Sequence, residues 1–233
     1  MTASPLAAAS AAAEAPIAVR LEGRLLIVRF AEPQRVASWA IVGGGLGRAR
    51  TVAWLQVGDA ELRPPVDARR YLRDRLEAAG VPDAVGLLTS RDVGTFTDVT
   101  CAYPGAAARC VATVGLGNAL RAGDLPGPDG RIGTINVLCH VSEPLSDEAL
   151  FETMALAAEA RALAVREAAV PSRRSGAPAS GTGTDCIVIA APARGTPAAY
   201  AGKHTVIGHV VGAAVLGAVL AGVERWRSEA GAR

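Results

Sequence analysis

Side chains that could carry out nucleophilic and acid–base chemistry gather in residues 180–209. Thr182, Thr184 and Asp185 lie among glycines, and His204 follows after a second loop. A threonine hydroxyl can attack a carbonyl carbon, an imidazole can take up the proton, and a carboxylate can orient the imidazole. This combination of residue types predicts an active site in the last quarter of the chain.

Glycines and apolar runs indicate how this segment is placed. We expect Gly181 and Gly183 to adopt positive φ angles, which would leave backbone N–H groups near Gly183 free to face an oxyanion. The run 186–191 is typical of a buried strand, so the polar cluster would lie at its start. His204 and Thr205 directly precede a long apolar stretch, which predicts a position at a helix N-terminus.

Four ordered motifs resemble the adenosylcobinamide amidohydrolase (CbiZ) family. They are T-V-G-L-G-N-A at 113–119, G-T-I-N at 133–136, T-G-T-D at 182–185 and Y-A-G-K-H-T-V-I-G at 200–208. The resemblance extends over residues 36–224, nearly the whole folded part. It implies hydrolysis of the amide that joins the aminopropanol arm to the corrin ring of adenosylcobinamide, which gives adenosylcobyric acid in corrinoid salvage.

Hydrolysis of such an amide needs an activated nucleophile, a stabilised oxyanion and an acid for the leaving nitrogen. We expect His204 to act as base and then as acid, Asp185 to orient it, and water or the hydroxyl of Thr184 or Thr182 to attack. The alternative is structural, with Asp185 capping a turn and His204 capping a helix. No protein-bound metal is expected, because His204 and His209 do not have the spacing of two ligands on one helical face.

The substrate that the resemblance implies is a large, flat molecule with amides around its rim. Its pocket would need apolar surface and neutral hydrogen-bonding groups, for which Asn118, Asn136, Tyr200, Thr205 and the loop at Gly183 are suitable. Asn136 lies within an apolar run, so its amide would either contact the ligand or bracket the backbone. The cobalt would arrive with the substrate, and no separate cofactor is expected.

Composition limits the fold class and the partners. A chain of 233 residues with 50% hydrophobic residues predicts one α/β or α+β domain over residues 17–228, with a mixed, largely antiparallel sheet packed by helices. Residues 1–16 are Ala-rich, and we expect a disordered tail there instead of a signal peptide. The 24 basic and 22 acidic residues are intermixed, so no basic surface for nucleic acid is expected. Only 4% of the residues are aromatic, which leaves few side chains on which nucleic-acid bases could stack. Nucleic acid is therefore not an expected partner. Scattered cysteines indicate a cytoplasmic protein.

Further elements follow from local patterns. We expect a hairpin around Glu22-Gly23-Arg24, a helix between Pro64-Pro65 and Gly80, and a helix from Ser146 to about Ala169. Residues 206–223 are apolar enough for a membrane span, but their recurrent glycines favour a buried helix, with a transmembrane helix as the alternative. The expected strands are 17–21, 25–30, 36–42, 51–57, 84–89, 99–102, 109–115, 132–141 and 186–191.

Other functions predict different experimental results. A non-catalytic corrinoid-binding protein would bind adenosylcobinamide tightly without releasing aminopropanol. A membrane component would need detergent. A threonine-dependent amidohydrolase or acyltransferase with a different substrate would form a covalent acyl adduct. The expected hydrolase is compatible with a homo-oligomer.

Overall fold

The structure is a computed structural model that describes residues 17–58, 60–127 and 133–231. The tail predicted for residues 1–16 lies outside this part of the chain. The strands are β1 (Ile17–Glu22), β2 (Leu25–Ser38), β3 (Gly45–Gln56), β4 (Val85–Thr89), β5 (Thr97–Tyr103), β6 (Ala106–Val114), β7 (Ala119–Leu120), β8 (Ile135–Val141), β9 (Gly181–Thr182) and β10 (Cys186–Pro192). The helices are α1 (Ala68–Ala78), α2 (Asp147–Glu167) and α3 (Val206–Gly231), with a 3-10 turn η1 at Val93–Thr95.

An eight-stranded mixed sheet organises the molecule. Its order is β4-β3-β2-β10-β8-β6-β5, with β1 paired to β2, and β7 and β9 form a separate ribbon. The pairs β3–β4 and β8–β10 are parallel, whereas the other pairs of the large sheet are antiparallel. The predicted single domain with a mixed, largely antiparallel sheet is therefore confirmed.

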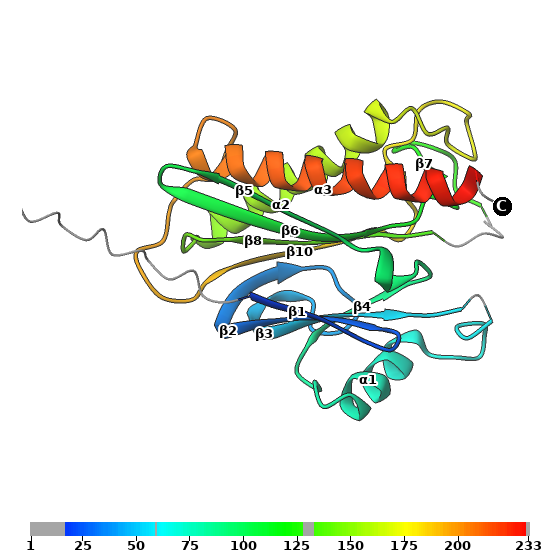
Figure 1. The fold of residues 1–233 in the computed structure, drawn as a ribbon, viewed down its shortest axis with the longest axis horizontal. Helices are drawn as coiled ribbons and strands as arrows, with labels where there is room; N and C mark the ends of the chain where they lie inside the picture. Colours follow the sequence, from blue (N-terminus) through cyan, green and yellow to red (C-terminus); the bar gives the residue numbers. More distant parts are fainter. Residues whose placement is uncertain (1–16, 59, 128–132, 232–233) are drawn as a thin grey trace, which may run out of the picture.

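A bend in β2 divides this sheet into two stacked halves. Its pairing with β3 shifts between Arg29 and Gln34. The strand is continuous over Leu25–Ser38, so it joins the strand expected at 25–30 to the first part of the one expected at 36–42. The first half of β2 pairs with β1 and the second half pairs with β10. Figure 1 shows β1–β4 stacked against β5, β6, β8 and β10. Apolar residues from both halves, such as Trp54 and Leu138, form one core between them.

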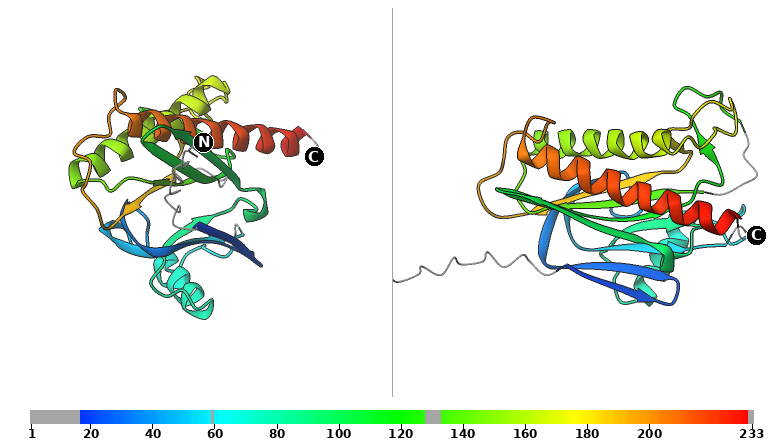
Figure 2. Two further views of the ribbon diagram at one scale, coloured as in Figure 1. Left: turned by 60° about the vertical axis from the view of Figure 1, so that its left-hand side comes forward. Right: turned by 45° about the horizontal axis from the view of Figure 1, so that its top comes forward.

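Helices cover the two outer faces. Helices α2 and α3 lie side by side over β5, β6, β8 and β10, and α1 lies on the opposite side (Figures 1 and 2). Ser146 caps α2 as predicted, because its hydroxyl accepts from Ala149 N at 3.1 Å. Helix α1 begins only after Asp67, whose carboxylate accepts from the backbone N–H groups of Arg69 and Arg70. The domain therefore has four layers, which are α1, the two halves of the sheet, and α2 with α3. One apolar core lies between each two neighbouring layers.

Helix α3 occupies the place expected for a buried helix. By length and composition alone it could cross a membrane, but 56% of its most apolar 18-residue stretch is buried inside the domain. A Cβ added to Gly222 would collide with the side chain of Val114 in β6, and one at Gly217 would lie 3.4 Å from Val99 in β5. The glycines therefore let the helix pack closely on the sheet.

Parallel pairing of β8 and β10 determines where the functional segments meet. Asn136 pairs with Cys186 and His140 pairs with Ala190. Since both strands run in the same direction, the segments before them meet at one end of the sheet and the segments after them meet at the other. The loops at 133–135 and 181–185 are therefore neighbours.

Candidate active site

Three of the four sequence motifs converge at the start of β8 and β10. The backbone N–H of Gly115 donates to the carbonyl of Thr134 at 3.0 Å. Ala119 pairs with Thr182 in the β7–β9 ribbon, and the N–H of Ile135 donates to Asp185 Oδ1 at 3.0 Å. Segments that are far apart in the sequence thus form one hydrogen-bonded cluster.

Gly133 shows how closely these segments approach. A Cβ at this position would lie 2.5 Å from Asn118 Oδ1 and 2.7 Å from the backbone N of Gly117. Asn118 is buried behind Gly133, with 7% of its surface exposed. The predicted substrate-binding residue Asn118 therefore lies against the G-T-I-N segment and is not one of the residues that line the cleft described below.

Asp185 links three elements of the cluster. Its carboxylate accepts from the N–H of Thr182 at 2.9 Å, from the Thr182 hydroxyl at 2.5 Å and from Ile135 N at 3.0 Å. It also forms an ion pair with Arg161 of α2, and only 6% of the Asp185 side chain and 16% of the Arg161 side chain are exposed. The bond to Thr182 N closes a local turn, which is the structural alternative considered for this residue.

The glycines of this loop serve a purpose different from the one expected. Neither Gly181 nor Gly183 has a positive φ angle. A Cβ on Gly181 would instead collide with the Arg161 guanidinium and the Asp185 carboxylate. Glycine is needed at position 181 because the ion pair occupies the space of a side chain.

A cleft of about 470 Å³ opens beside this cluster, between the two halves of the sheet. Its apolar wall comes from the first ninety residues and includes Trp39, Ile41, Val57, Leu62 and Leu88. Its polar floor includes Thr134, Asn136, Gly183, Thr184 and Asp185. Four predicted site residues, Asn136, Gly183, Thr184 and Asp185, therefore share one cavity.

Asn136 brings to the floor a buried amide oxygen that no described donor reaches. The residue is 1% exposed, and its Nδ2 donates to the carbonyl of Leu88 at 2.8 Å. In the described part of the chain, no donor reaches its Oδ1. The amide thus braces β4 and at the same time offers a free acceptor, so both predicted roles are compatible with its geometry.

Thr134 is a site residue that the sequence reasoning missed. Its hydroxyl lies 2.8 Å from the hydroxyl of Thr184, which also contacts the carbonyl of Gly133 at 3.1 Å. Thr134 comes two positions before Asn136, and alternate residues of a strand share one face. That spacing within G-T-I-N was the signal that could have revealed it.

His204 does not lie with this cluster. The structure places it in the exposed turn before α3, beyond the far end of β10, and the loop of residues 193–205 (orange) lies at the opposite end of the sheet from β7 in Figure 1. The expectation that Asp185 orients His204 therefore does not hold, because parallel β8 and β10 separate their two ends and the Asp185 oxygens bind other groups.

The neighbours of His204 have structural contacts at that far end. Thr205 caps α3 as its position predicted: its hydroxyl donates to Gly202 O at 2.8 Å and accepts from Gly208 N at 2.9 Å. Tyr200 is 72% exposed. None of these residues lines the cleft. Thr182 also lies outside the cleft lining, but its hydroxyl donates to Asp185.

Cys186 lines the cleft but has the properties of a core residue. It is 8% exposed, and burial raises the pKa of its thiol to about 11. A thiol with this pKa stays protonated near neutral pH, which makes it a poor nucleophile. Among the residues described, no group of three or more His, Cys, Asp or Glu side chains could hold a metal ion.

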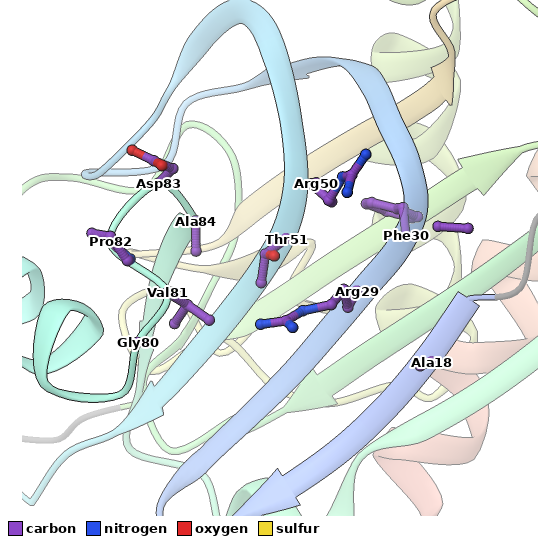
Figure 3. A pocket seen from close by; sticks show the side chains of 11 residues that line it. Ala18, Arg29, Phe30, Arg50, Thr51, Gly80, Val81, Pro82, Asp83 and Ala84 are labelled. Atoms are coloured by element: carbon purple, nitrogen blue, oxygen red, sulfur yellow. The ribbon is translucent and has the colours of Figure 1, made fainter.

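A second cavity, of about 490 Å³, lies by the bend of β2 and β3 and the turn that follows α1 (Figure 3). Arg29, Arg50, Thr51 and Asp83 contribute its polar groups. It contains no residue of the four motifs. Size alone therefore does not identify the active site, whereas the convergence of the motifs does.

Comparisons with known proteins agree with the motifs. Residues 10–231 match the family described as adenosylcobinamide amidohydrolase, CbiZ. A protein of Halobacterium salinarum named adenosylcobinamide amidohydrolase is 32% identical over 201 residues, which cover 81% of this chain and 80% of that protein. A Burkholderia sp. β-aminopeptidase structure shares 14% identity at a TM-score of 0.45, over 85% of this chain and 78% of its own. On the first two matches, this chain belongs to the adenosylcobinamide amidohydrolase family.

Proposed function

We propose that this chain hydrolyses the amide between the aminopropanol arm and the corrin ring of adenosylcobinamide in the cleft at the start of β8 and β10. Family membership supports the reaction, which yields adenosylcobyric acid in corrinoid salvage. One observation supports the location: three motif segments from distant parts of the chain meet there, and two of them line the cleft.

The cleft suits one end of a large corrinoid. Its volume of about 470 Å³ is that of a small-molecule pocket, so it would take up the amide-bearing arm while much of the ring stays outside. The apolar wall around Trp39 would contact the hydrocarbon edge of the ligand. The buried Oδ1 of Asn136, which no described donor reaches, would accept the N–H of the substrate amide and so fix its orientation.

The polar floor supplies groups for the reaction. Thr184, whose hydroxyl is one of those expected to attack, lines the cleft. Backbone N–H groups around Gly183 would stabilise the oxyanion. Asp185 would act as a positioning residue, because its hydrogen bonds to Thr182 and Ile135 hold the two loops that carry the floor.

The cobalt enters with the corrinoid, and no separate cofactor is assigned. All four cysteines are free, which supports a reducing cytoplasmic location. We propose a single domain at 17–228 that acts on a small molecule without nucleic acid or membrane, and a homo-oligomer is compatible with this.

The decisive experiment is incubation of the purified chain with adenosylcobinamide. We expect chromatography to show adenosylcobyric acid and aminopropanol in equal amounts. The variant Asn136→Ala should lose most of this turnover, whereas Arg29→Ala in the second cavity should not. Tight binding of adenosylcobinamide without aminopropanol release would instead identify a non-catalytic corrinoid-binding protein.

A further inference from the structure

We infer that Thr134 is the residue that attacks the substrate carbonyl, forming an acyl ester, and that Thr184 relays the protons. This inference rests on the proposed amide hydrolysis. It assigns the nucleophile to a threonine of the G-T-I-N segment instead of the T-G-T-D loop.

Thr134 differs from Thr182 and Thr184 in where its hydroxyl hydrogen can go. A threonine hydroxyl has one hydrogen to donate. The Thr184 hydroxyl lies 3.1 Å from the carbonyl of Gly133, which can only accept, and 2.8 Å from the Thr134 hydroxyl, where either oxygen can donate. Both hydrogen bonds form together only when Thr184 donates to Gly133 and Thr134 donates to Thr184. In this arrangement the Thr134 hydroxyl has an acceptor for its proton.

The other two threonines lack this arrangement. The Thr182 hydroxyl donates to Asp185 Oδ1 at 2.5 Å and lies outside the cleft lining. The Thr184 hydroxyl directs its hydrogen to the carbonyl of Gly133, and a carbonyl oxygen holds no proton of its own that it could pass on to a leaving nitrogen. Thr134 alone of the three both lines the cleft and points its proton at another hydroxyl.

The backbone holds Thr134 from both sides. Its carbonyl accepts from Gly115 N at 3.0 Å, and the next N–H, that of Ile135, donates to Asp185 Oδ1 at 3.0 Å. Thr134 is 5% exposed, so its side chain has little freedom. A nucleophile fixed in this way loses little entropy when the substrate amide is placed against it.

The first chemical step forms the ester and releases the amine. The Thr134 oxygen forms a bond to the amide carbon while the bond from this carbon to nitrogen breaks. The Thr134 proton passes to the Thr184 oxygen. The Thr184 hydroxyl turns away from the carbonyl of Gly133 and passes its original proton to the leaving nitrogen, which departs as neutral aminopropanol. The amide oxygen of Asn136 would hold the N–H of the scissile amide until the bond breaks.

Water completes the reaction by the reverse relay. Its oxygen bonds to the ester carbon, and one of its protons passes to Thr184. The proton of Thr184 returns to the Thr134 oxygen as the ester bond breaks, which releases adenosylcobyric acid and restores both hydroxyls.

The test compares Thr134→Val, which keeps the shape and removes the hydroxyl, with Thr134→Ser, which keeps a hydroxyl. We expect kcat to fall by roughly a thousandfold or more in Thr134→Val and to stay within about tenfold of the unmodified chain in Thr134→Ser. Thr153→Val is the matched control, because Thr153 is also buried and donates only to Ala149 O of its own helix. This control should keep full turnover.

A covalent readout separates catalysis from a structural role. After an acid quench, intact mass and peptide mapping should place the adenosylcobyryl group on Thr134, and on the new hydroxyl in Thr134→Ser. Hydroxylamine should divert product to the hydroxamate without reducing aminopropanol release. If Thr134→Val fails to fold, the mapping and the hydroxylamine result decide.

Three results would overturn the assignment: a folded Thr134→Val with turnover within tenfold of the unmodified chain, an adduct on another residue, or no diversion by hydroxylamine. Each of them leaves the proposed amide hydrolysis intact. Absence of turnover in the unmodified chain would instead refute that proposed function itself.

Discussion

The carboxylate of Asp185 pairs with the guanidinium of Arg161, and this ion pair joins helix α2 to the loop that carries Thr184. Both side chains are largely buried, at 6% and 16% exposure. Buried pairs differ from exposed ones because loss of one partner leaves an uncompensated charge away from water.

The substitution Asp185→Asn should lower the free energy of unfolding by about 3 kcal/mol, because the Arg161 charge loses its partner. Urea unfolding of the two proteins measures this change. The double variant Asp185→Asn with Arg161→Met should be more stable than Asp185→Asn alone, since it also removes the orphaned charge. Glu159→Gln, in the exposed pair with Lys203, should cost less than about 1 kcal/mol. Equal costs for the two single variants would contradict this account.

Replacement of His204 provides a direct test of where the reaction takes place. His204 is exposed in the turn before α3 and is absent from the cleft lining, so His204→Ala should keep turnover within about threefold and should melt at nearly the same temperature. Steady-state kinetics and a thermal melt measure both. A folded His204→Ala protein without turnover would return the histidine to the mechanism and move the active site to the far end of the sheet.

Trp39 should contribute to substrate binding more than to the chemical step. Its indole is 49% exposed on the cleft wall, and its Nε1 donates to the backbone carbonyl of Asp185 at 2.7 Å. Trp39→Phe should raise KM several-fold, by roughly 1 kcal/mol of lost contact, with little change in kcat. Leu46→Ala is the control, because Leu46 is equally exposed and lies outside the cleft lining. A fall in kcat at constant KM would instead indicate that Trp39 positions Asp185.

His140 should make stability dependent on pH. Burial, followed by the nearby charge of Arg109, lowers the pKa of His140 from 6.5 to about 4. Between these two values the unfolded chain binds a proton that the folded chain does not, so the free energy of unfolding should decrease as the pH falls from 6.5 towards 4. Nε2 of His140 lies 3.2 Å from Gln34 Oε1, and Arg109 is itself paired with Asp98.

The variant His140→Gln isolates this contribution, because it retains an N–H donor for Gln34 and removes the titrating ring. Urea unfolding at pH 7 and pH 4.5 should show a smaller loss of stability in the variant than in the unmodified chain. Other titrating groups are common to both proteins and cancel in the comparison. Parallel losses would show that His140 does not titrate in this range.

The sequence predicted most individual elements because their patterns are local. Ser146 begins α2 and the Glu22-Gly23-Arg24 turn joins β1 to β2, as capping and turn residues indicated. The continuity of β2 was missed, since Arg29 and Gln34 belong to one strand whose shift in register depends on its partner β3. The stacking of the sheet halves follows from this bend and leaves no signal in local periodicity.

The candidate site was predicted in part for a similar reason. Thr184, Asp185 and Asn136 could be selected because polar residues beside apolar strands are conspicuous. The partners of Asp185 could not, because Arg161 comes from the middle of a helix and Ile135 contributes only its backbone. Proximity in sequence also suggested that His204 joins Asp185, whereas the direction of β10 carries the chain away.

The two sides of the cleft come from different stretches of the polypeptide: its wall from residues before position 91 and its floor from residues after position 133. Mutations that reshape the wall can therefore accumulate without touching the groups proposed to react. A lineage with this architecture could shift from one corrinoid to another by changing the early stretch alone. Exchange of that stretch between related proteins would change which corrinoid the cleft accepts.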